Sequence, residues 1–219
     1  MALIVTQDGS HSVYSEQYGV TYHSRYGAVT ESLHVFIQAG LRYKAAVQPR
    51  LAVLEVGLGT GLNAFLTWIE AERRNLTVRY TALESAPLSL EEAEVFNYPE
   101  HLGLPERRPD FCRLHYCAWE RAVRLSAHFW LRKKRMPVQA YRPVQAFDLI
   151  YFDAFAPTAQ PEMWTEAVLR AMYRALRPEG MLVTYCAKGQ VKRALRAVGF
   201  EVESLPGPPG KREMTRAWK

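Results

Sequence analysis

The sequence predicts an α/β domain with a doubly wound, mostly parallel sheet that closes in an antiparallel hairpin. Apolar segments of strand type alternate with amphipathic helical segments through most of the 219 residues, and this alternation is typical of a parallel sheet covered by helices. Two last strand-like segments follow each other without a helix between them, which favours the closing hairpin. Residues 1–50 do not fit the alternation, so we expect a small N-terminal extension or substrate cap, followed by the main domain over 51–219.

The N-terminal extension is expected to hold a short hairpin and one helix. Segments 3–6 and 12–14 have strand-like composition and are joined at Asp8-Gly9, a dipeptide typical of hairpin turns. In segment 30–41 the apolar residues fall on one helical face. The tyrosines of segment 18–28 either line a substrate pocket or pack the extension onto the sheet.

Segment 51–63 carries the clearest local signal. An apolar run, typical of a parallel strand buried on both faces, ends in Glu55 and is followed by a glycine-rich turn and a helix. Glycines allow a sharp turn and a close approach of the backbone to a ligand. Ligands of open α/β sheets bind at the carboxyl ends of the strands. We therefore expect a ligand at Gly57, Gly59, Thr60, Gly61 and Asn63.

The acid next to this loop favours a cationic ligand. The dinucleotide pattern Gly-x-Gly-x-x-Gly places a diphosphate at the helix start, whereas this chain has Gly-x-Gly-x-Gly with Glu55 two residues ahead. A carboxylate there would repel a diphosphate and would suit S-adenosylmethionine (SAM). Glu84 ends the predicted strand 78–84 and could accept hydrogen bonds from both ribose hydroxyls. An unspecified nucleotide, a purely structural turn, and a solvent-facing or helix-capping Glu84 remain alternatives.

The other elements continue the alternation. Helices are expected over 62–73, between Pro87 and Pro99, and over 162–176 and 188–197. Further strands are expected over 111–115, 147–153 and 181–186, with a turn at 177–180 and the closing hairpin formed by 200–205 and 213–218. Segment 129–135 can be a strand or a hairpin arm, and its charge is expected to keep it out of the buried core.

The net charge of +6 is unevenly distributed along the chain. Residues 101–150 hold ten Lys/Arg against four Asp/Glu, and residues 188–219 hold eight against three. Such segregation would suit an acidic macromolecular partner, or else forms a solvated basic surface. No apolar stretch approaches the roughly 20 residues that cross a bilayer, and the first ten residues do not resemble a signal peptide. Three scattered cysteines indicate neither a disulfide framework nor a zinc cluster, so we expect a cytoplasmic protein.

Asp153 is the candidate catalytic residue. It ends the strand 147–153 at the same sheet edge as Glu55 and Glu84. The segment Ala154-Phe155-Ala156-Pro157 follows it, and a proline stiffens the backbone beside the acid. A carboxylate in this place can accept hydrogen bonds from an amine. The alternative is a helix-capping or structural aspartate.

Several stretches together resemble one family, the methyltransferase domain of the tRNA-modification enzyme MnmC and its stand-alone form MnmD. The matching stretches are Tyr22-His23-Ser24, Glu31 with His34-Val35-Phe36-Ile37, Glu55 to Asn63, Tyr80-Thr81-Ala82-Leu83-Glu84, Tyr151-Phe152-Asp153-Ala154-Phe155-Ala156-Pro157, Pro161-Glu162-Met163-Trp164-Thr165 and Gly210-Lys211-Arg212-Glu213-Met214. The resemblance covers nearly the whole chain. It implies a Rossmann-like SAM-dependent methyltransferase fold.

The resemblance implies methyl transfer from SAM to the aminomethyl nitrogen of 5-aminomethyl-(2-thio)uridine at the tRNA wobble position. It also implies a functional link to the enzymes that install the aminomethyl group, and a reaction that uses no metal. At this length there is no room for the flavin-dependent oxidase domain, so the stand-alone form without flavin is expected. Many SAM enzymes have Gly-Asp after the third strand, whereas residues 115–120 contain no Asp. Adenine is therefore expected to contact backbone groups and Trp119.

Aromatic and basic residues are the candidates for contacts with the tRNA anticodon loop. A base in a single-stranded loop can be splayed out and stacked on aromatic rings, and cations can hold the phosphates. The candidates are Tyr22, Phe155, Pro157, Trp164, Lys211 and Arg212, and Lys133, Lys134 and Arg135 either extend this track or form a solvated face. Two other classes remain open: a SAM-dependent N-methyltransferase or related transferase acting on a small-molecule or protein amine, and a non-catalytic RNA-binding module.

Overall fold

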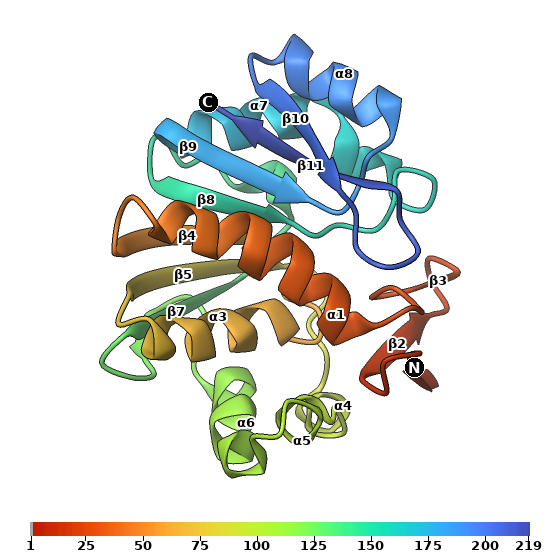
Figure 1. The fold of residues 1–219 in the computed structure, drawn as a ribbon, viewed down its shortest axis with the longest axis vertical. Helices are drawn as coiled ribbons and strands as arrows, with labels where there is room; N and C mark the ends of the chain where they lie inside the picture. Colours follow the sequence, from red (N-terminus) through yellow and green to blue (C-terminus); the bar gives the residue numbers. More distant parts are fainter. Residues whose placement is uncertain (1) are drawn as a thin grey trace.

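The computed structural model describes residues 2–219 and contains two sheets of unequal size (Figure 1). The strands are β1 (Ala2–Val5), β2 (His11–Ser15), β3 (Val20–Thr21), β4 (Arg50–Val56), β5 (Thr77–Glu84), β6 (Ala122–Arg124), β7 (Phe129–Arg135), β8 (Phe147–Phe152), β9 (Leu176–Thr184), β10 (Glu201–Pro206) and β11 (Glu213–Trp218). The helices are α1 (Ala28–Ser32), the π-helical η1 (Leu33–Arg42), α2 (Tyr43–Ala45), α3 (Leu62–Arg73), α4 (Leu90–Glu94), α5 (Tyr98–His101), η2 (Pro105–Arg107), α6 (Arg108–Tyr116), η3 (Val138–Ala140), η4 (Pro161–Trp164), α7 (Glu166–Ala175) and α8 (Gly189–Ala197).

The main sheet has eight strands in the order β10-β11-β9-β8-β4-β5-β7-β6. The central strands β9, β8, β4, β5 and β7 pair in parallel, whereas β6, β10 and β11 pair antiparallel with their neighbours. The carboxyl ends of the five parallel strands therefore meet at one edge. The predicted doubly wound α/β sheet with an antiparallel closing hairpin is confirmed.

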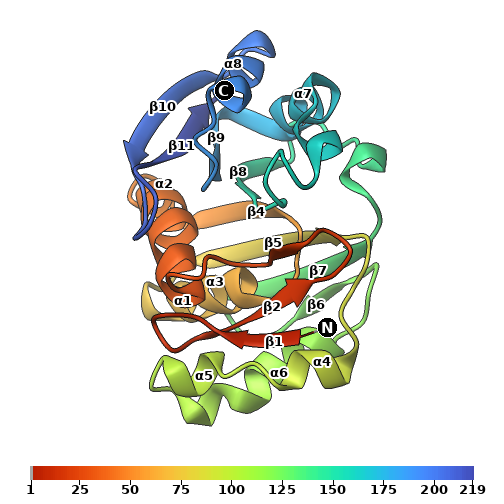
Figure 2. The ribbon, with the colours of Figure 1, turned by 90° about the vertical axis from the view of Figure 1, so that its right-hand side faces the viewer.

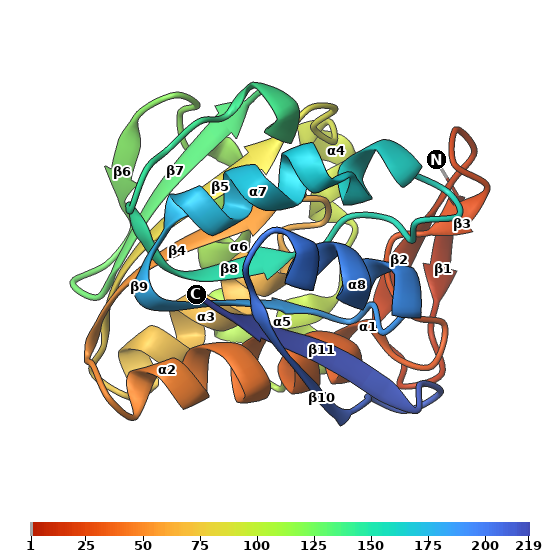
Figure 3. The ribbon, with the colours of Figure 1, turned by 90° about the horizontal axis from the view of Figure 1, so that it is seen from above.

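Helices cover both faces of the main sheet, with α1, α2 and α3 on one side and α7 on the other (Figure 2). The central strands contribute side chains to the hydrophobic cores on both faces of the sheet, because successive side chains point to opposite faces. Val53 of β4 and Tyr151 of β8 belong to one hydrophobic core, and their neighbours Leu54 and Ile150 belong to the other. This two-sided burial explains why these strands are continuously apolar in sequence. Seen from above, β8 and β9 run between these helical layers (Figure 3).

The segment 111–115, expected to be the third strand, belongs to helix α6, so that prediction is wrong. Phe111 and Leu114 are fully buried and lie three residues apart, a spacing that brings two side chains to one face of a helix. The third parallel neighbour is β7, which pairs with β5. Short apolar runs do not separate helix from strand by periodicity alone.

The expectation that charge keeps 129–135 out of the core is also wrong. Phe129, Leu131 and Lys133 alternate along β7 on its buried face, and Lys133 is only 1% exposed. Its ammonium lies 4.8 Å from the centre of the Trp119 ring and donates a hydrogen bond to the carbonyl of His115. These partners stabilise the buried cation, and they remove Lys133 from any phosphate-binding track.

Smaller differences concern the ends of elements. The helix expected after Pro87 begins at Leu90, where Ser89 and Glu92 form a reciprocal capping box. The helix expected over 162–176 is a short 3-10 turn followed by α7. The turn expected at 177–180 is an irregularity within β9, in which Glu179 adopts a left-handed φ of 61°. Among residues 2–219, no helix combines the length and apolar character needed to cross a bilayer.

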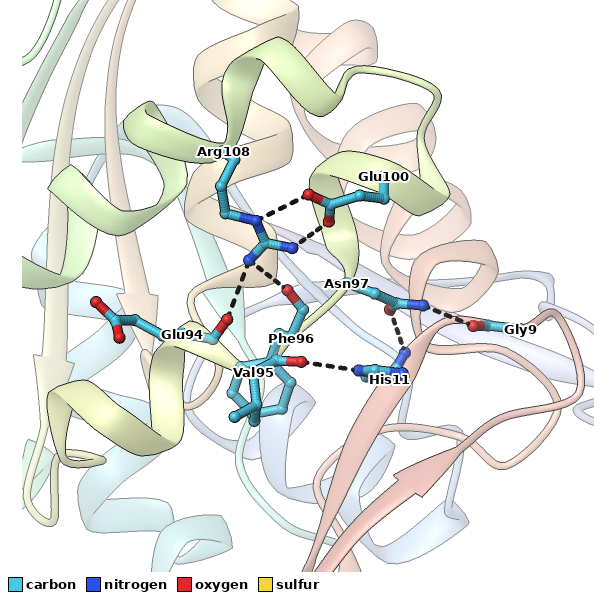
Figure 4. A network of polar contacts seen from close by, with 8 residues as sticks. All are labelled: Gly9, His11, Glu94, Val95, Phe96, Asn97, Glu100 and Arg108. Carbon is cyan, nitrogen blue, oxygen red and sulfur yellow. Dashed lines mark hydrogen bonds and ion pairs between the residues drawn. The ribbon is translucent and has the colours of Figure 1, made fainter.

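The N-terminal hairpin of β1 and β2 is confirmed, and polar contacts hold it to the segment before α5 (Figure 4). Asn97 donates from Nδ2 to the carbonyl of Gly9 (3.0 Å) and accepts at Oδ1 from the backbone N–H of His11 (2.9 Å). Arg108 donates to the Phe96 carbonyl at 2.7 Å and pairs with Glu100. These contacts fix the extension beside the carboxyl edge of the main sheet. The domain boundary at residue 50 stays a prediction.

Candidate active site

A cavity of about 350 Å³ opens at the carboxyl edge of the main sheet. Its walls come from the glycine loop after β4, the ends of β5 and β7, the segment after β8, and the N-terminal extension. The sequence candidates that line it are Tyr22, Gly57, Gly59, Glu84, Asp153 and Phe155. Its volume lies within the range of small-molecule sites, roughly 300–1,000 Å³. The sheet edge predicted from the strand order is therefore the place where the candidate residues converge.

The glycine loop approaches its neighbours too closely for side chains. Gly57 has a φ of 89°, and a Cβ on it would lie 2.9 Å from the carbonyl oxygen of Asp153. A Cβ on Gly59 would lie 3.1 Å from the Tyr22 ring. The backbone N–H groups of Gly57 and Leu58 both donate to the carbonyl of Leu83. The glycines thus let the ends of β4, β5 and β8 close around one cavity.

Glu84 links the loop to the end of β5. Its Oε2 accepts a hydrogen bond from the Gly59 N–H at 3.0 Å, and its Oε1 accepts one from the Ala86 N–H at 2.9 Å. Each carboxylate oxygen has a second acceptor site, and Glu84 lines the cavity. The carboxylate can therefore hold the loop and still accept hydrogen bonds from a ligand.

Asp153 lies in the cavity wall with one oxygen held in place. Asn63, in the first turn of α3, donates from Nδ2 to Asp153 Oδ2 at 2.8 Å. Burial, together with the negative charge of Glu31, raises the pKa of Asp153 to about 7, and the Asn63 hydrogen bond and the Lys211 charge act in the opposite direction. A carboxylate with a pKa near neutrality can take up a proton at physiological pH.

Glu55 differs from the role expected for it. Its side chain is fully buried and lies beside Asn63 and Tyr80, outside the lining of the cavity. Within residues 2–219, neither of its carboxyl oxygens has a hydrogen-bond partner. Burial and the nearby charge of Asp153 raise its pKa well above the usual range. Burial therefore favours the neutral form of Glu55, whereas the sequence argument treats it as a charge.

The aromatic candidates divide between two cavities. The Phe155 ring packs against Tyr18 (centroids 4.8 Å apart) and edge-on against Tyr22 (5.0 Å) in the large cavity. Trp164 is buried and donates from Nε1 to the Phe155 carbonyl at 2.8 Å. With Pro157, it lines a neighbouring cavity of about 170 Å³. Trp164 thus supports the position of Phe155 from behind.

Lys211 is paired inside the protein. Its ammonium forms an ion pair with the buried carboxylate of Glu31 and lies 3.9 Å from the centre of the Tyr185 ring. Tyr185 in turn donates from its hydroxyl to the Ala154 carbonyl at 2.8 Å. Arg212, by contrast, is exposed. Of the two cations expected on this turn, Lys211 is therefore paired and partly buried, whereas Arg212 is exposed.

Other candidates lie behind the cavity wall. Thr60 Oγ1 is 2.9 Å from His23 Nε2, and burial lowers the pKa of His23 to about 4, so this ring is neutral. Gly61 starts α3 with a φ of 76°. Trp119 is outside the cavity lining and lies next to Lys133. The adenine contact expected for Trp119 assumed that residues 111–115 form the third strand. These residues belong to helix α6.

The sequence reasoning missed the segment that follows the actual third strand. Residues 136–139, directly after β7, line the cavity on the side of Glu84. The signal was present in Met136-Pro137, the point where the charged strand stops.

A family model described as S-adenosyl-L-methionine-dependent methyltransferase matches residues 114–219. The tRNA 5-methylaminomethyl-2-thiouridine biosynthesis bifunctional protein MnmC of Cupriavidus metallidurans is 33% identical over 98% of this chain and 33% of that protein. The crystal structure of MNMC2 from Aquifex aeolicus matches with a TM-score of 0.76 and 26% identity over 98% of this chain and 69% of that one. In sequence and in fold, the chain is similar to SAM-dependent methyltransferases.

The chain spans about a third of the length of the curated relatives that it matches. A more distant neighbour shares the fold: 1,6-didemethyltoxoflavin-N1-methyltransferase from Burkholderia thailandensis, with S-adenosylhomocysteine bound, matches with a TM-score of 0.51 and 16% identity over 84% of this chain and 77% of that one. The Rossmann-like fold expected from the resemblance is thereby confirmed.

The residues of the cavity fit SAM. The ligand carries a positive sulfonium, and the cavity wall holds two carboxylates, Glu84 and Asp153. The loop 57–59 lines the cavity, and Glu84 keeps acceptor sites for hydroxyl groups. Glu84, the loop 57–59 and residues 136–139 are the groups of the cavity wall that could hold SAM, and Asp153 lies in the same wall.

Proposed function

We propose that this protein transfers a methyl group from SAM to the aminomethyl nitrogen of 5-aminomethyl-(2-thio)uridine at the wobble position of tRNA, giving the 5-methylaminomethyl form. The observation that carries the proposal is Asp153, a carboxylate in the cavity wall with a pKa of about 7. The relatives named for tRNA 5-methylaminomethyl-2-thiouridine biosynthesis support this choice of substrate. The reaction would take place in the cytoplasm, after the enzymes that install the aminomethyl group, and needs neither metal nor flavin.

Asp153 would accept the proton of the substrate amine. When bound, SAM supplies a methyl group on a positively charged sulfur. The aminomethyl group is largely protonated near neutral pH, as other alkylamines are, and only the free amine can attack. Asn63 holds Asp153 Oδ2, which leaves Oδ1 to accept the hydrogen bond and then the proton from the amine. Because displacement requires an in-line approach, this fixed position contributes to the rate.

Asn63 would position the Asp153 carboxylate, and Glu55 would position Asn63. A second buried negative charge beside Asp153 would raise the pKa of Asp153 further, since like charges disfavour ionisation. A neutral Glu55 avoids this repulsion and can donate its proton to Asn63 Oδ1, a buried atom without another partner among residues 2–219. Asn63 is then fixed at both ends and acts as a positioning residue.

Replacing Asn63 by Ala should lower the rate of methyl transfer by about 10–100-fold, the scale of a misplaced catalytic group. Because the Asn63 hydrogen bond lowers the pKa of Asp153, its loss should also move the rising limb of the pH–rate profile to higher pH. Pre-steady-state rates between pH 5.5 and 9 test both effects. The matched control is Glu55→Gln, a neutral isostere, which should retain SAM affinity and rate. A large loss of SAM affinity in Glu55→Gln would instead indicate a charged Glu55.

Nucleoside mass spectrometry tests the proposed function directly. Purified protein is incubated with SAM and tRNA that carries 5-aminomethyl-2-thiouridine, and the digested nucleosides are analysed. We expect a gain of one methyl group on that nucleoside, absent without SAM. Reactions with small amines in place of tRNA run in parallel. Transfer to a small amine but not to tRNA, with SAM binding verified by calorimetry, would overturn the proposal.

A further inference from the structure

The N-terminal extension and the turn between β10 and β11 meet beside the cavity. Glu31 and Lys211 form an ion pair across this contact, and His34 Nε2 lies 2.8 Å from the carbonyl of Pro206. The Tyr26 ring packs directly on Gly210, where a Cβ would overlap it. Two segments that are about 180 residues apart in sequence thus form one continuous surface.

Three residues at this contact are directed to solvent. Arg25 and Arg212 are exposed, and the Tyr26 side chain is 50% exposed although its ring rests on Gly210. In the part of the chain that the structure describes, neither arginine has an ion-pair partner. We call Arg25, Tyr26 and Arg212 the patch.

The patch is continuous with the active site. Tyr22 and His23 belong to the same loop as Arg25, and both line the cavity. On the other side, Lys211 precedes Arg212 and contacts the Tyr185 ring, whose hydroxyl binds the carbonyl next to Asp153. A chain that enters the cavity with one group can therefore contact the patch with its neighbouring groups.

We propose that the patch binds the RNA next to the target nucleotide, with a base stacked on Tyr26 and the flanking phosphates bound by Arg25 and Arg212. This inference rests on the proposed function and adds the surface by which the tRNA is held. Aromatic rings bind splayed bases of single-stranded RNA by stacking. Arginine binds phosphate oxygens in a bidentate manner.

The charge distribution favours RNA as the occupant. The cavity wall carries the carboxylates of Glu84 and Asp153, so phosphates are repelled there and have to bind outside. Glu31 pairs with Lys211, whereas Arg25 and Arg212 are exposed and have no ion-pair partner among residues 2–219. The Gly210 backbone supports one face of the Tyr26 ring, which leaves a preformed platform for stacking. The acidic cavity suits the cationic aminomethyl group, and the basic, aromatic patch beside it suits the negatively charged RNA that carries this group.

Binding of tRNA at several salt concentrations tests the patch. Arg25→Ala and Arg212→Ala should each weaken binding and reduce the slope of log K against log salt by about 0.7–1. Tyr26→Ala should weaken binding by about 10-fold, within the range measured for base stacking on aromatic residues, whereas Tyr26→Phe should bind like the wild type. The matched control is Arg174→Ala, an exposed arginine whose carbonyl binds the Gln145 N–H before β8.

These measurements separate the inference from the proposed function. Binding is measured with tRNA with and without the aminomethyl group, so it needs no methyl transfer. Circular dichroism and SAM calorimetry verify that each variant is folded. If the wild type methylates tRNA and the patch variants have the same affinity and salt slope as Arg174→Ala, the patch does not bind the RNA and the inference is wrong. If Tyr26→Phe binds as weakly as Tyr26→Ala, the stacking role is wrong.

Discussion

Replacing Asp153 by Asn should lower the single-turnover rate of methyl transfer by about 10²–10⁴-fold, the scale of lost acid–base assistance, while SAM still binds. Asparagine has nearly the same shape, and its amide oxygen can accept the Asn63 hydrogen bond that now ends on Asp153 Oδ2. It cannot take up a proton from the substrate amine. The measurement is a rapid-quench experiment with saturating SAM and modified tRNA, together with the dissociation constant for SAM.

The pH dependence gives this prediction a second, independent part. The pKa of Asp153 is raised to about 7, so the fraction of the carboxylate form increases as pH rises through 7. The wild-type rate should therefore rise from pH 6 to pH 8 with an inflection near pH 7, and Asp153→Asn should lose this inflection and follow only the increasing fraction of the free amine. A variant with a near-wild-type rate, or with an unchanged pH profile, would remove Asp153 from the mechanism.

The central strands and the glycine loop could be predicted from sequence because their signals are local. β4 and β8 are buried on both faces, so most of their residues are apolar. Three glycines at 57, 59 and 61 have positive φ values, which glycine adopts without strain. Once these elements are parallel neighbours, their carboxyl ends have to meet. Asp153 and Glu84 therefore fall into one site without any knowledge of distant contacts.

The burial of β7 could not be predicted because the partners of its lysine come from other elements. A lysine in a strand is normally taken as a mark of exposure, yet Lys133 is buried by the His115 carbonyl and the Trp119 ring. This error moved the predicted adenine contact to Trp119 and away from residues 136–139. One misassigned element thus left the cavity-lining residues 136–139 out of the predicted site.

The charge states of the site could not be predicted for a similar reason. Sequence places Glu55 near the ligand, but its ionisation depends on full burial and on the neighbouring Asp153. Likewise, Lys211 is a surface cation by its position in a turn, and only the tertiary fold pairs it with Glu31. Electrostatic roles follow from three-dimensional surroundings, whereas the order of strands follows from patterns along the chain.

Replacing Glu84 by Ala should weaken SAM binding by about 10²-fold or more. Hydrogen bonds to a charged group contribute roughly 1.5–3 kcal/mol each, and the change removes those to the Gly59 and Ala86 N–H groups as well as the proposed ones to the ribose. Calorimetry with SAM and with an analogue that lacks the ribose 2′-hydroxyl separates the two contributions in a double-mutant cycle. The analogue should bind the wild type more weakly than SAM does, and Glu84→Ala should no longer discriminate between them. If discrimination persists in Glu84→Ala, Glu84 only holds the glycine loop, and another residue binds the ribose.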